Sequence, residues 1–238
     1  DLSTYGLGAF VYDKDGDGSY EITALHLYIY THEVICGLDW DEVNVTGGTG
    51  SIYFAGGLFG FEDENLRYNY NGAYPADENG WGFTADQIVL SDGDYFDVAH
   101  FNDWMFYADS AYGFHYFTNE NDDINISYSA ETGTALPLKL IRVGGGMGMG
   151  DTTTAEAGYT VCYGSSIGNA IGSVTTDDDG VGSITFSNPG TYYVWCNGGE
   201  GDNGTIVSSP ASATVTVTGE STGGNPGNGS GSGDGEGS

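Results

Sequence analysis

The sequence predicts a mainly β protein: a β-rich, sandwich-like N-terminal domain with one helix packed on it, followed by a smaller β-sandwich. Short apolar runs alternate with glycine, asparagine and aspartate turn signals along most of the 238 residues, a pattern typical of short strands. Residues 22–36 instead repeat apolar side chains at helical spacing, so we expect the one substantial helix there. The length leaves room for two domains of ordinary size.

Two changes of composition divide the chain into three parts. The glycine-rich stretch GGGMGMG, residues 144–150, separates an apolar run from a threonine-rich one. From Gly219 onward no large apolar side chain could offset the entropy lost on ordering. We therefore predict an aromatic-rich domain over residues 1–143, a β-sandwich over residues 144–218 and a Gly/Ser/Asp-rich linker or tail over residues 219–238.

The expected strands lie between the turn signals. In the first domain a short strand precedes an acidic loop and the helix, and aromatic strands follow. In the second domain, turns such as the hairpin-type DDDG at residues 177–180 separate short strands. The strands expected in the first domain are residues 8–12, 51–61, 66–70, 87–90, 95–102, 113–117, 125–129 and 137–143, and those expected in the second are 158–163, 168–175, 181–186, 191–196 and 212–218.

The chain is strongly acidic. Four basic residues stand against 34 acidic ones, which gives a net charge of −30. Such a chain repels phosphate backbones and anionic lipid headgroups, so we expect neither nucleic acid nor membrane surfaces as partners. Solubility outside the cell and a dedicated cation-binding role both explain this acidity, and composition leaves the two open.

A secreted, cell-surface location is expected. No apolar run approaches the roughly 18 to 20 residues that a membrane span requires. The chain begins at Asp1 rather than Met, for which a removed signal peptide is the simplest explanation. Abundant glycine, asparagine, threonine and tyrosine with almost no lysine is a composition that we associate with exported bacterial surface proteins.

The acidic loop before the helix has the spacing of a calcium site. Carboxylates alternate along DKDGDGSYE, and Gly18 at the sixth position lets the chain turn while oxygens converge on a hard cation. A complete loop of this type has a bidentate acid at its twelfth position, where this chain has Ala24. Either another acid, such as Glu33, fills in, or the loop is an acidic turn leading into the helix. The candidate calcium ligands are Asp13, Asp15, Asp17 and Glu21.

Three cysteines leave one without a partner. Cys162 and Cys196 lie on expected strands of the second domain, with Trp195 nearby, so we predict an inter-sheet disulfide between them. Such a bridge would contribute about 3 to 4 kcal/mol in the chain-entropy description. The alternative is two buried thiols. Cys36, at the helix end, is predicted to be a core thiol because no histidine or basic residue is placed near it to activate it.

Two segments of the first domain mix aromatic rings with amides. Tyrosine or tryptophan beside asparagine and aspartate suits a neutral sugar, which presents flat C–H faces and hydroxyl edges. Core packing is the alternative for any single ring, but it does not explain why Trp81 and Trp104 follow Asn-Gly and Asn-Asp. The candidate ligand-binding residues are Tyr68, Tyr70, Asn71, Tyr74, Trp81, Asp103 and Trp104.

No arrangement of residues points to catalysis. His26 and His32 are six positions apart, which does not place them together on one helix face, and His100 and His115 are expected to be ordinary strand residues. Carboxylate pairs are frequent, but glycoside hydrolysis also requires a set separation in space, which neighbours in such an acidic chain do not indicate. We expect no catalytic residue and no enzyme activity.

Several segments of the first domain resemble a known extracellular module. DKDGDGSYEITALHLYIYTHE, residues 13–33, resembles the DxDGDGxxTxxDALxxAHE segment of clostridial surface proteins that carry a domain similar to the C-terminal domain of transcobalamin. That family's aspartate after the helix-starting threonine is Ala24 here. YNYNGAY, LSDGDYFDVAHF and FYADSAYGFHYF are similar to later blocks of the same family.

The second domain resembles a different module. VTTDDDGVGSITFSNPGTYYVWC, residues 174–196, is similar to bacterial immunoglobulin-like or carboxypeptidase-regulatory-like modules, which implies an immunoglobulin-like or prealbumin-like sandwich. Together the two resemblances imply an extracellular, multi-modular binding protein, and they name no ligand.

Three functions follow as hypotheses. The first is a non-catalytic extracellular module that binds a neutral glycan, such as an α-glucan or starch, on the aromatic-polar surface of the N-terminal domain. The second is an adhesin or filament subunit that contacts cell-surface proteins or assembles with itself through the C-terminal tail. The third, which the transcobalamin-like resemblance implies, is capture of a small cofactor such as cobalamin.

Overall fold

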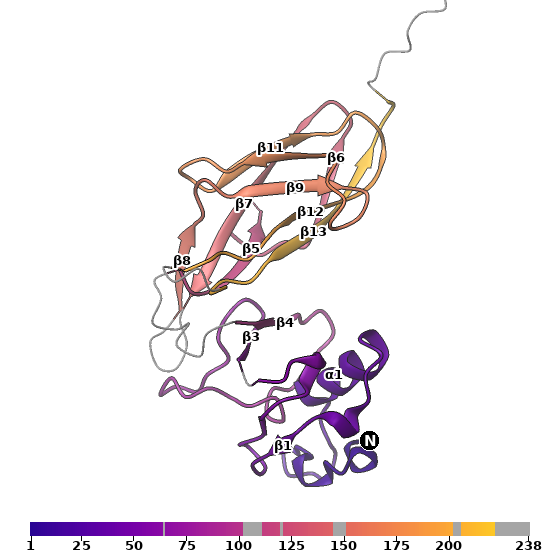
Figure 1. The fold of residues 1–238 in the computed structure, drawn as a ribbon, viewed down its shortest axis with the longest axis vertical. Helices are drawn as coiled ribbons and strands as arrows, with labels where there is room; N and C mark the ends of the chain where they lie inside the picture. The colour runs from indigo at the N-terminus through magenta and orange to yellow at the C-terminus, as the bar shows by residue number, and fades with distance from the viewer. Residues whose placement is uncertain (64, 102–110, 120, 145–150, 202–205, 222–238) are drawn as a thin grey trace, which may run out of the picture.

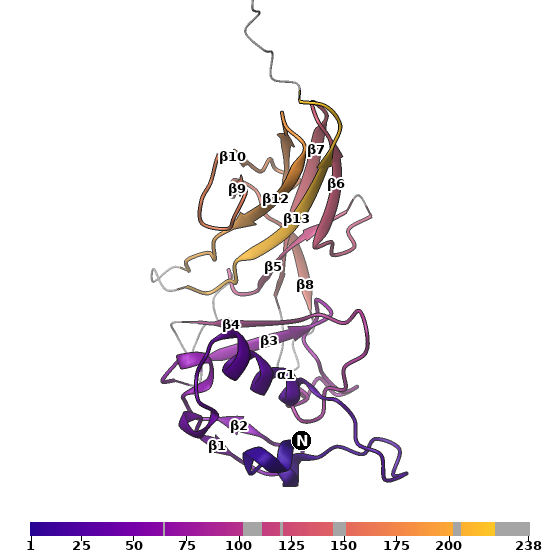
Figure 2. The same cartoon turned by 90° about the vertical axis from the view of Figure 1, so that its right-hand side faces the viewer.

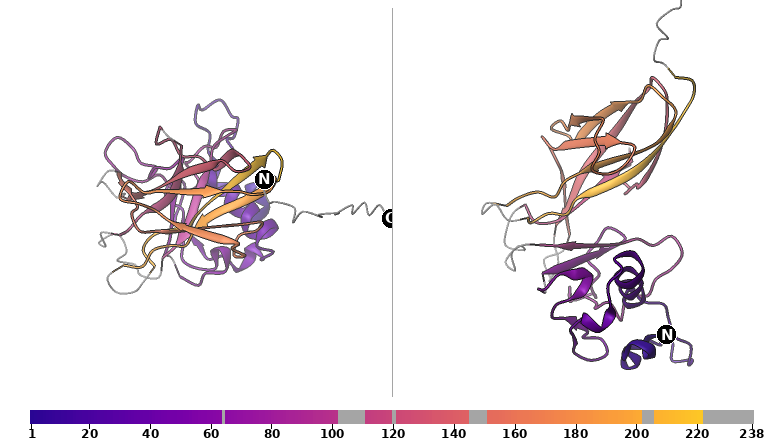
Figure 3. Two further views of the ribbon diagram at one scale, coloured as in Figure 1. Left: turned by 90° about the horizontal axis from the view of Figure 1, so that it is seen from above. Right: turned by 45° about the vertical axis from the view of Figure 1, so that its right-hand side comes forward.

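The chain forms two units stacked end to end, an N-terminal unit of helices, turns and short strands and a β-sandwich (Figure 1; Figure 3, right). This architecture is that of a computed structural model, which describes residues 1–63, 65–101, 111–119, 121–144, 151–201 and 206–221. Strands make up most of the regular structure, so the predicted mainly β fold is confirmed. No helix in the described ranges is long and apolar enough to cross a membrane.

The N-terminal unit consists of short elements joined by turns. Its strands form two antiparallel pairs, β1 with β2 and β3 with β4. The strand predicted at residues 8–12 is wrong, because that segment contains a 3-10 turn, and the one predicted at residues 87–90 contributes a single bridge. In chain order the elements are η1 (Leu2–Tyr5), η2 (Gly8–Phe10), α1 (Ala24–Tyr30), η3 (Thr31–Ile35), η4 (Trp40–Glu42), β1 (Val45–Thr46), β2 (Tyr53–Phe54), η5 (Leu58–Gly60), β3 (Leu66–Tyr70) and β4 (Phe96–His100).

The predicted helix is present as α1, which η3 continues as a π-helical turn. It begins after Thr23, whose backbone N–H donates to His26 Nδ1 at 3.1 Å and so satisfies one of the free donors at the helix start. The face predicted to be apolar is buried from Ala24 to His32, whereas Cys36 at its end is exposed. Tyr28 on that face lies 5.5 Å from Phe54 and 5.6 Å from Phe96, measured between ring centroids, and so joins the helix to β2 and β4.

The sandwich consists of two packed sheets. One has five strands in the order β10-β9-β12-β13-β6, and the other has four, in which β11, β7 and β5 follow one another and β8 also pairs with β7. The inner faces meet in a core that includes Leu138, Leu140, Val194 and Val215. The strands are β5 (Phe114–Thr118), β6 (Ser127–Glu131), β7 (Ala135–Gly144), β8 (Thr152–Ala155), β9 (Thr160–Gly164), β10 (Gly172–Thr175), β11 (Val181–Thr185), β12 (Gly190–Cys196) and β13 (Ala211–Thr218).

Strand pairing places the domain boundary earlier in the chain than predicted. Strands β5, β6 and β7, assigned from the sequence to residues 1–143, belong to the sandwich, because β7 pairs with β11 and β6 runs parallel to β13. The glycine-rich stretch taken as a boundary connects β7 to β8, which are antiparallel neighbours in one sheet. The sandwich therefore begins at β5, and residues 144–218 are part of it rather than a complete domain.

An apolar cluster joins the two units. It contains Phe101, which follows β4, together with Phe114 and Tyr116 on β5 and Ile141 and Val143 on β7. Figure 2 shows β3 and β4 at the end of the N-terminal unit that faces the sandwich. Because this face of the four-stranded sheet is covered by the first unit instead of by water, the junction is a continuous core.

Candidate functional site

Trp81 has the most exposed ring among the predicted ligand-binding residues that the structure describes, with 74% of its surface in solvent. It lies in a hairpin over residues 74–83, whose arms meet at a bridge between Ala76 and Gly82. Phe83 on the same arm is 38% exposed. The hairpin therefore presents a large ring to water, the kind of side chain that is enriched at binding surfaces.

Asp77 fixes the backbone at the tip of this hairpin. Its Oδ1 accepts from the Asn79 amide at 2.8 Å and from the Trp81 amide at 2.9 Å, and its own amide donates to the Trp81 carbonyl at 2.8 Å. The bond from the Trp81 amide is the main reason that the pKa of the Asp77 carboxyl lies below its usual range. Gly80 takes a left-handed φ of 82°, which favours glycine. The tip is preorganised, so binding has little backbone entropy to remove.

Tyr68 and Tyr74 hold the base of the hairpin instead of standing free in water. Tyr68 Oη donates to the Phe83 carbonyl at 2.5 Å, and its ring stacks on Phe96 with centroids 5.3 Å apart. Burial raises the pKa of Tyr68. The Tyr74 hydroxyl lies against Gly82, where an added Cβ would come within 2.0 Å of it. Tyr68 and Tyr74 therefore contact the arm of the hairpin that carries Trp81 and help to position it.

Tyr70 and Asn71 are engaged in a second turn. Asn71, with φ 50°, and Gly72, with φ 80°, occupy the left-handed positions of a turn closed by hydrogen bonds between the Tyr70 and Ala73 backbones. Asp94 accepts from Tyr70 Oη at 2.6 Å and from Asn71 Nδ2 at 2.8 Å. Both side chains are thus used to join β3 to the segment before β4.

The second predicted aromatic segment, which includes Asp103 and Trp104, lies outside the described residues. Among the tryptophans of the described chain, Trp40 and Trp195 are buried and Trp81 is exposed. The geometry therefore centres the candidate site on the Trp81 hairpin.

The acidic loop before α1 uses its carboxylates to hold its own backbone. Asp13 accepts from the amides of Gly16 at 2.7 Å and Gly18 at 2.9 Å, and Asp17 accepts from the Ser19 amide at 2.8 Å. In the ranges described, no three His, Cys, Asp or Glu side chains converge as a metal site requires. Calcium binding by the loop stays a prediction. Its ligand set remains Asp13, Asp15, Asp17 and Glu21.

The predicted disulfide between Cys162 and Cys196 is wrong. The two residues lie on β9 and β12, which are neighbours in one sheet and not in facing sheets. Cys162 pairs directly with Trp195, so these two side chains share one face of the sheet and Cys196 points to the other. All three cysteines are free, burial raises the pKa of Cys196 to about 12, and Cys36 is exposed, contrary to the prediction of a core thiol.

His115, expected to be an ordinary strand residue, is buried beside an ion pair. A carbonyl can only accept, so His115 Nδ1 donates to the Ser209 carbonyl at 2.6 Å and leaves Nε2 as an acceptor. Nε2 lies 4.0 Å from Glu156 Oε2, and Glu156 Oε1 accepts from Arg142 Nε at 2.7 Å. Burial lowers the pKa of His115 and so favours its neutral ring.

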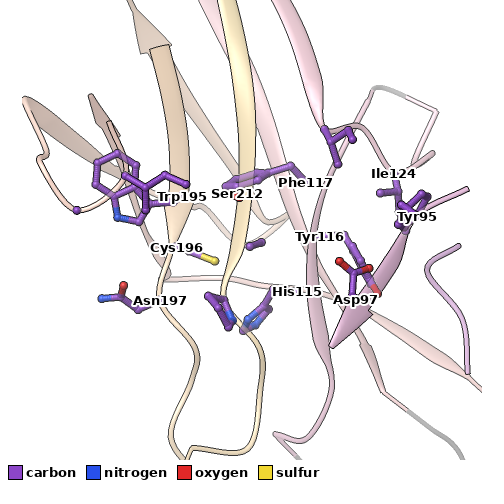
Figure 4. Close-up of a pocket in the computed structure, with 15 residues that line it drawn as sticks. Tyr95, Asp97, His115, Tyr116, Phe117, Ile124, Trp195, Cys196, Asn197 and Ser212 are labelled. Atoms are coloured by element: carbon purple, nitrogen blue, oxygen red, sulfur yellow. The ribbon is translucent and has the colours of Figure 1, made fainter. Parts of the chain in front are cut away.

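A cavity of about 370 Å³ next to His115 was also missed from the sequence (Figure 4). Segments far apart in the chain form it, so no local pattern could reveal it. A histidine within the aromatic run of β5 was the one available signal. The lining residues are Tyr95, Asp97, His115, Tyr116, Phe117, Ile124, Ile126, Ile167, Gly168, Trp195, Cys196, Asn197, Pro210, Ala211 and Ser212.

No family model, curated protein or solved structure matches this chain. The resemblances to a transcobalamin-like domain and to an immunoglobulin-like module therefore stay predictions. The function has to be argued from the residues and their geometry.

Proposed function

We propose that this chain is a non-catalytic extracellular module that binds a neutral glycan, such as an α-glucan, on the surface around Trp81. The observation that supports this most directly is the indole that is 74% exposed on a hydrogen-bonded hairpin. The flat C–H face of a sugar stacks on such a ring, and the stacking removes apolar surface from water. The rigid tip limits the entropy lost on binding.

The polar groups around the ring favour a ligand without negative charge. Glu78 and Asn79 precede Trp81 in the hairpin tip, and both side chains accept hydrogen bonds from hydroxyl groups. The net charge of −30 repels an anionic polysaccharide at low ionic strength. A neutral hydroxyl-rich chain is not repelled in this way.

Affinity electrophoresis tests the proposal, with soluble starch, mannan, xylan and β-glucan each cast into a native gel. We expect at least one of them to retard the chain, and Trp81→Ala to weaken the apparent affinity about tenfold or more. The matched control is Tyr20→Ala, which removes another ring that is 70% exposed, far from the hairpin in sequence. The proposal fails if no neutral polysaccharide retards the chain, or if the Trp81 and Tyr20 variants behave alike.

A separate surface supports the second hypothesis, an adhesin or filament subunit that contacts proteins. Along the outer side of the α1–η3 helix, Tyr30, Val34 and Ile35 are 54%, 60% and 67% exposed. Tyr30 and Val34 are four positions apart and so are neighbours on the helix surface. Exposed apolar side chains that adjoin one another are typical of contact surfaces. Sedimentation velocity should then show association that rises with concentration and that Val34→Asp abolishes; a monomer at every concentration counts against it.

A further inference from the structure

Within the described residues, the carboxylate of Asp97 on β4 has no cationic partner. Asp97 lies opposite Asn69 in the β3–β4 pair, at the junction of the two units. Its Oδ2 is buried without a hydrogen-bond partner, and none of the ion pairs in the described ranges includes it. Burial raises the pKa of this carboxyl. Buried polar atoms without partners are rare in folded proteins, and a group supplied by a ligand is one explanation.

Two tyrosines lie beside this carboxylate. Tyr95 comes directly before β4, and Tyr116 lies on the face of β5 that belongs to the junction cluster. Their ring centroids are 6.3 Å apart, and the ring planes meet at 67°. Burial, and after it the charge of Asp97, raises the pKa of both tyrosines, so the carboxylate lies close to both rings. Tyr116 Oη is also buried, and no hydrogen bond of ordinary length joins it to Asp97.

These three residues line one end of the cavity beside His115. Figure 4 shows them together with Ile124 on one side of the cavity, while residues 195–197 lie on the other. His115 and Tyr116 are consecutive in β5 and point to opposite faces of the strand. His115 therefore faces the interior of the sandwich and is not part of the group around Asp97.

The chemistry of this end suits a cationic group on an apolar body. Among the described residues that line the cavity, Asp97 has the one carboxylate, and none is a lysine or an arginine. A protonated amine donates charge-assisted hydrogen bonds to a carboxylate, and the faces of tyrosine rings attract it. Ile124, which packs on the same apolar cluster as Tyr116, adds contact for an apolar body. An anion would instead meet the carboxylate with no cation to compensate.

We propose that this end of the cavity binds a small organic cation, a protonated amine carried on an aromatic or branched aliphatic body. The ammonium group donates to the Asp97 carboxylate, which reaches it by turning about its Cβ–Cγ bond, and to Tyr116 Oη. The apolar body lies against Ile124. A cavity of about 370 Å³ is large enough for such a molecule. The site is separate from the Trp81 surface and does not depend on glycan binding.

The test is an NMR titration of the full chain with three probes of similar size and different charge: 2-phenylethylammonium, 2-phenylethanol and 3-phenylpropionate. The ammonium probe should shift the backbone amides of Asp97 and Tyr116 in a saturable way. The alcohol should bind about tenfold more weakly or worse, because its hydrogen bond to the carboxylate carries no positive charge. The carboxylate probe should not bind.

A pair of aspartate variants separates the site from the general acidity of the chain. Asp97→Asn keeps the shape of the side chain and removes its charge, so the ammonium probe should bind about tenfold more weakly while the alcohol binds as before. Asp92→Asn is the matched control. It removes the same charge from an exposed residue in the turn before β4 that does not line the cavity, and it should leave both affinities unchanged.

A second pair of variants tests the aromatic wall. Tyr95→Leu should weaken binding of the ammonium probe severalfold and binding of the alcohol less, whereas Tyr95→Phe keeps the ring and should bind both as the wild type does. The proposal is overturned if the ammonium probe shows no saturable binding at millimolar concentration or if the alcohol binds equally well. It is also overturned if the two aspartate variants behave alike, or if Tyr95→Leu leaves the affinity for the ammonium probe unchanged.

Discussion

The Trp81 hairpin and the cavity beside His115 differ in which groups they present. At the hairpin a side chain is 74% exposed, and the backbone beneath it is satisfied by Asp77. In the cavity beside His115 the ring of Trp195 is only 7% exposed, and the lining is built from segments far apart in the chain. The comparison teaches that an exposed ring and a lined cavity are different features that call for different tests, and that one chain can carry both.

The largest effect on stability is expected from a substitution next to the cavity. His115, which lines the cavity, lies beside the buried Arg142–Glu156 pair, whose side chains are 14% and 10% exposed. Arg142→Met removes the partner of a buried carboxylate, so we expect a loss of about 3 to 5 kcal/mol in the free energy of unfolding. Urea denaturation followed by tryptophan fluorescence measures it. A loss under about 1 kcal/mol would show that solvent already satisfies Glu156.

At the tip of the hairpin, one partly exposed carboxylate, that of Asp77, accepts two backbone hydrogen bonds. Asp77→Ala removes the acceptor for the Asn79 and Trp81 amides, so the tip should loosen and glycan affinity should fall severalfold. Asp77→Asn keeps an acceptor oxygen and is the matched control. Hydrogen exchange at the Trp81 amide should accelerate in the alanine variant. If exchange at Trp81 is unchanged, the tip is held by other contacts and its preorganisation is misassigned.

Sequence reasoning could find the hairpin but not the cavity beside His115. The helix followed from apolar spacing around Leu25 and Tyr28, and Trp81 was indicated by its polar Asn-Gly context, because both signals are local. The cavity beside His115 depends on how residues 95–97, 115–117, 195–197 and 210–212 come together in space. No local pattern contains that information.

The misplaced domain boundary and the wrong disulfide have the same origin. A glycine-rich stretch is found both in linkers and between paired strands, so GGGMGMG could not by itself distinguish a domain boundary from the β7–β8 connection. Whether Cys162 and Cys196 share a face depends on the register of β9 against β12. Pairing and register are tertiary facts, and the sequence constrained them weakly here.

Asp97, which lines the cavity beside His115, should make the stability of the fold depend on pH. Burial raises the pKa of this carboxyl above its ordinary value of 3.8, so the folded state holds the proton more tightly than the unfolded chain does. The resulting stabilisation is complete below pH 3.8 and is lost as the pH rises through the raised pKa. Asp97→Asn should therefore be more stable than the wild type at pH 7, with a difference that shrinks toward pH 4. The urea unfolding midpoints of the variant and the wild type at pH 7 and pH 4 measure this difference. The account is contradicted if the advantage of the variant grows toward pH 4.

The smallest effect on stability is expected at Trp81, whose ring is highly exposed. Trp81→Ala should change the free energy of unfolding by less than about 0.5 kcal/mol, because the indole makes little contact with the fold. Thermal and urea unfolding of the variant check this. A loss above about 2 kcal/mol would mean that the indole supports the hairpin instead of serving a ligand.

The most direct test of the account follows the indole N–H signals of Trp81 and Trp195 by NMR while maltoheptaose and other neutral oligosaccharides are added. We predict that one of these sugars shifts the Trp81 signal in a saturable way and leaves the Trp195 signal in place. A Trp81 signal that stays still with every neutral sugar, at concentrations up to saturation of the solution, would contradict the glycan-binding function.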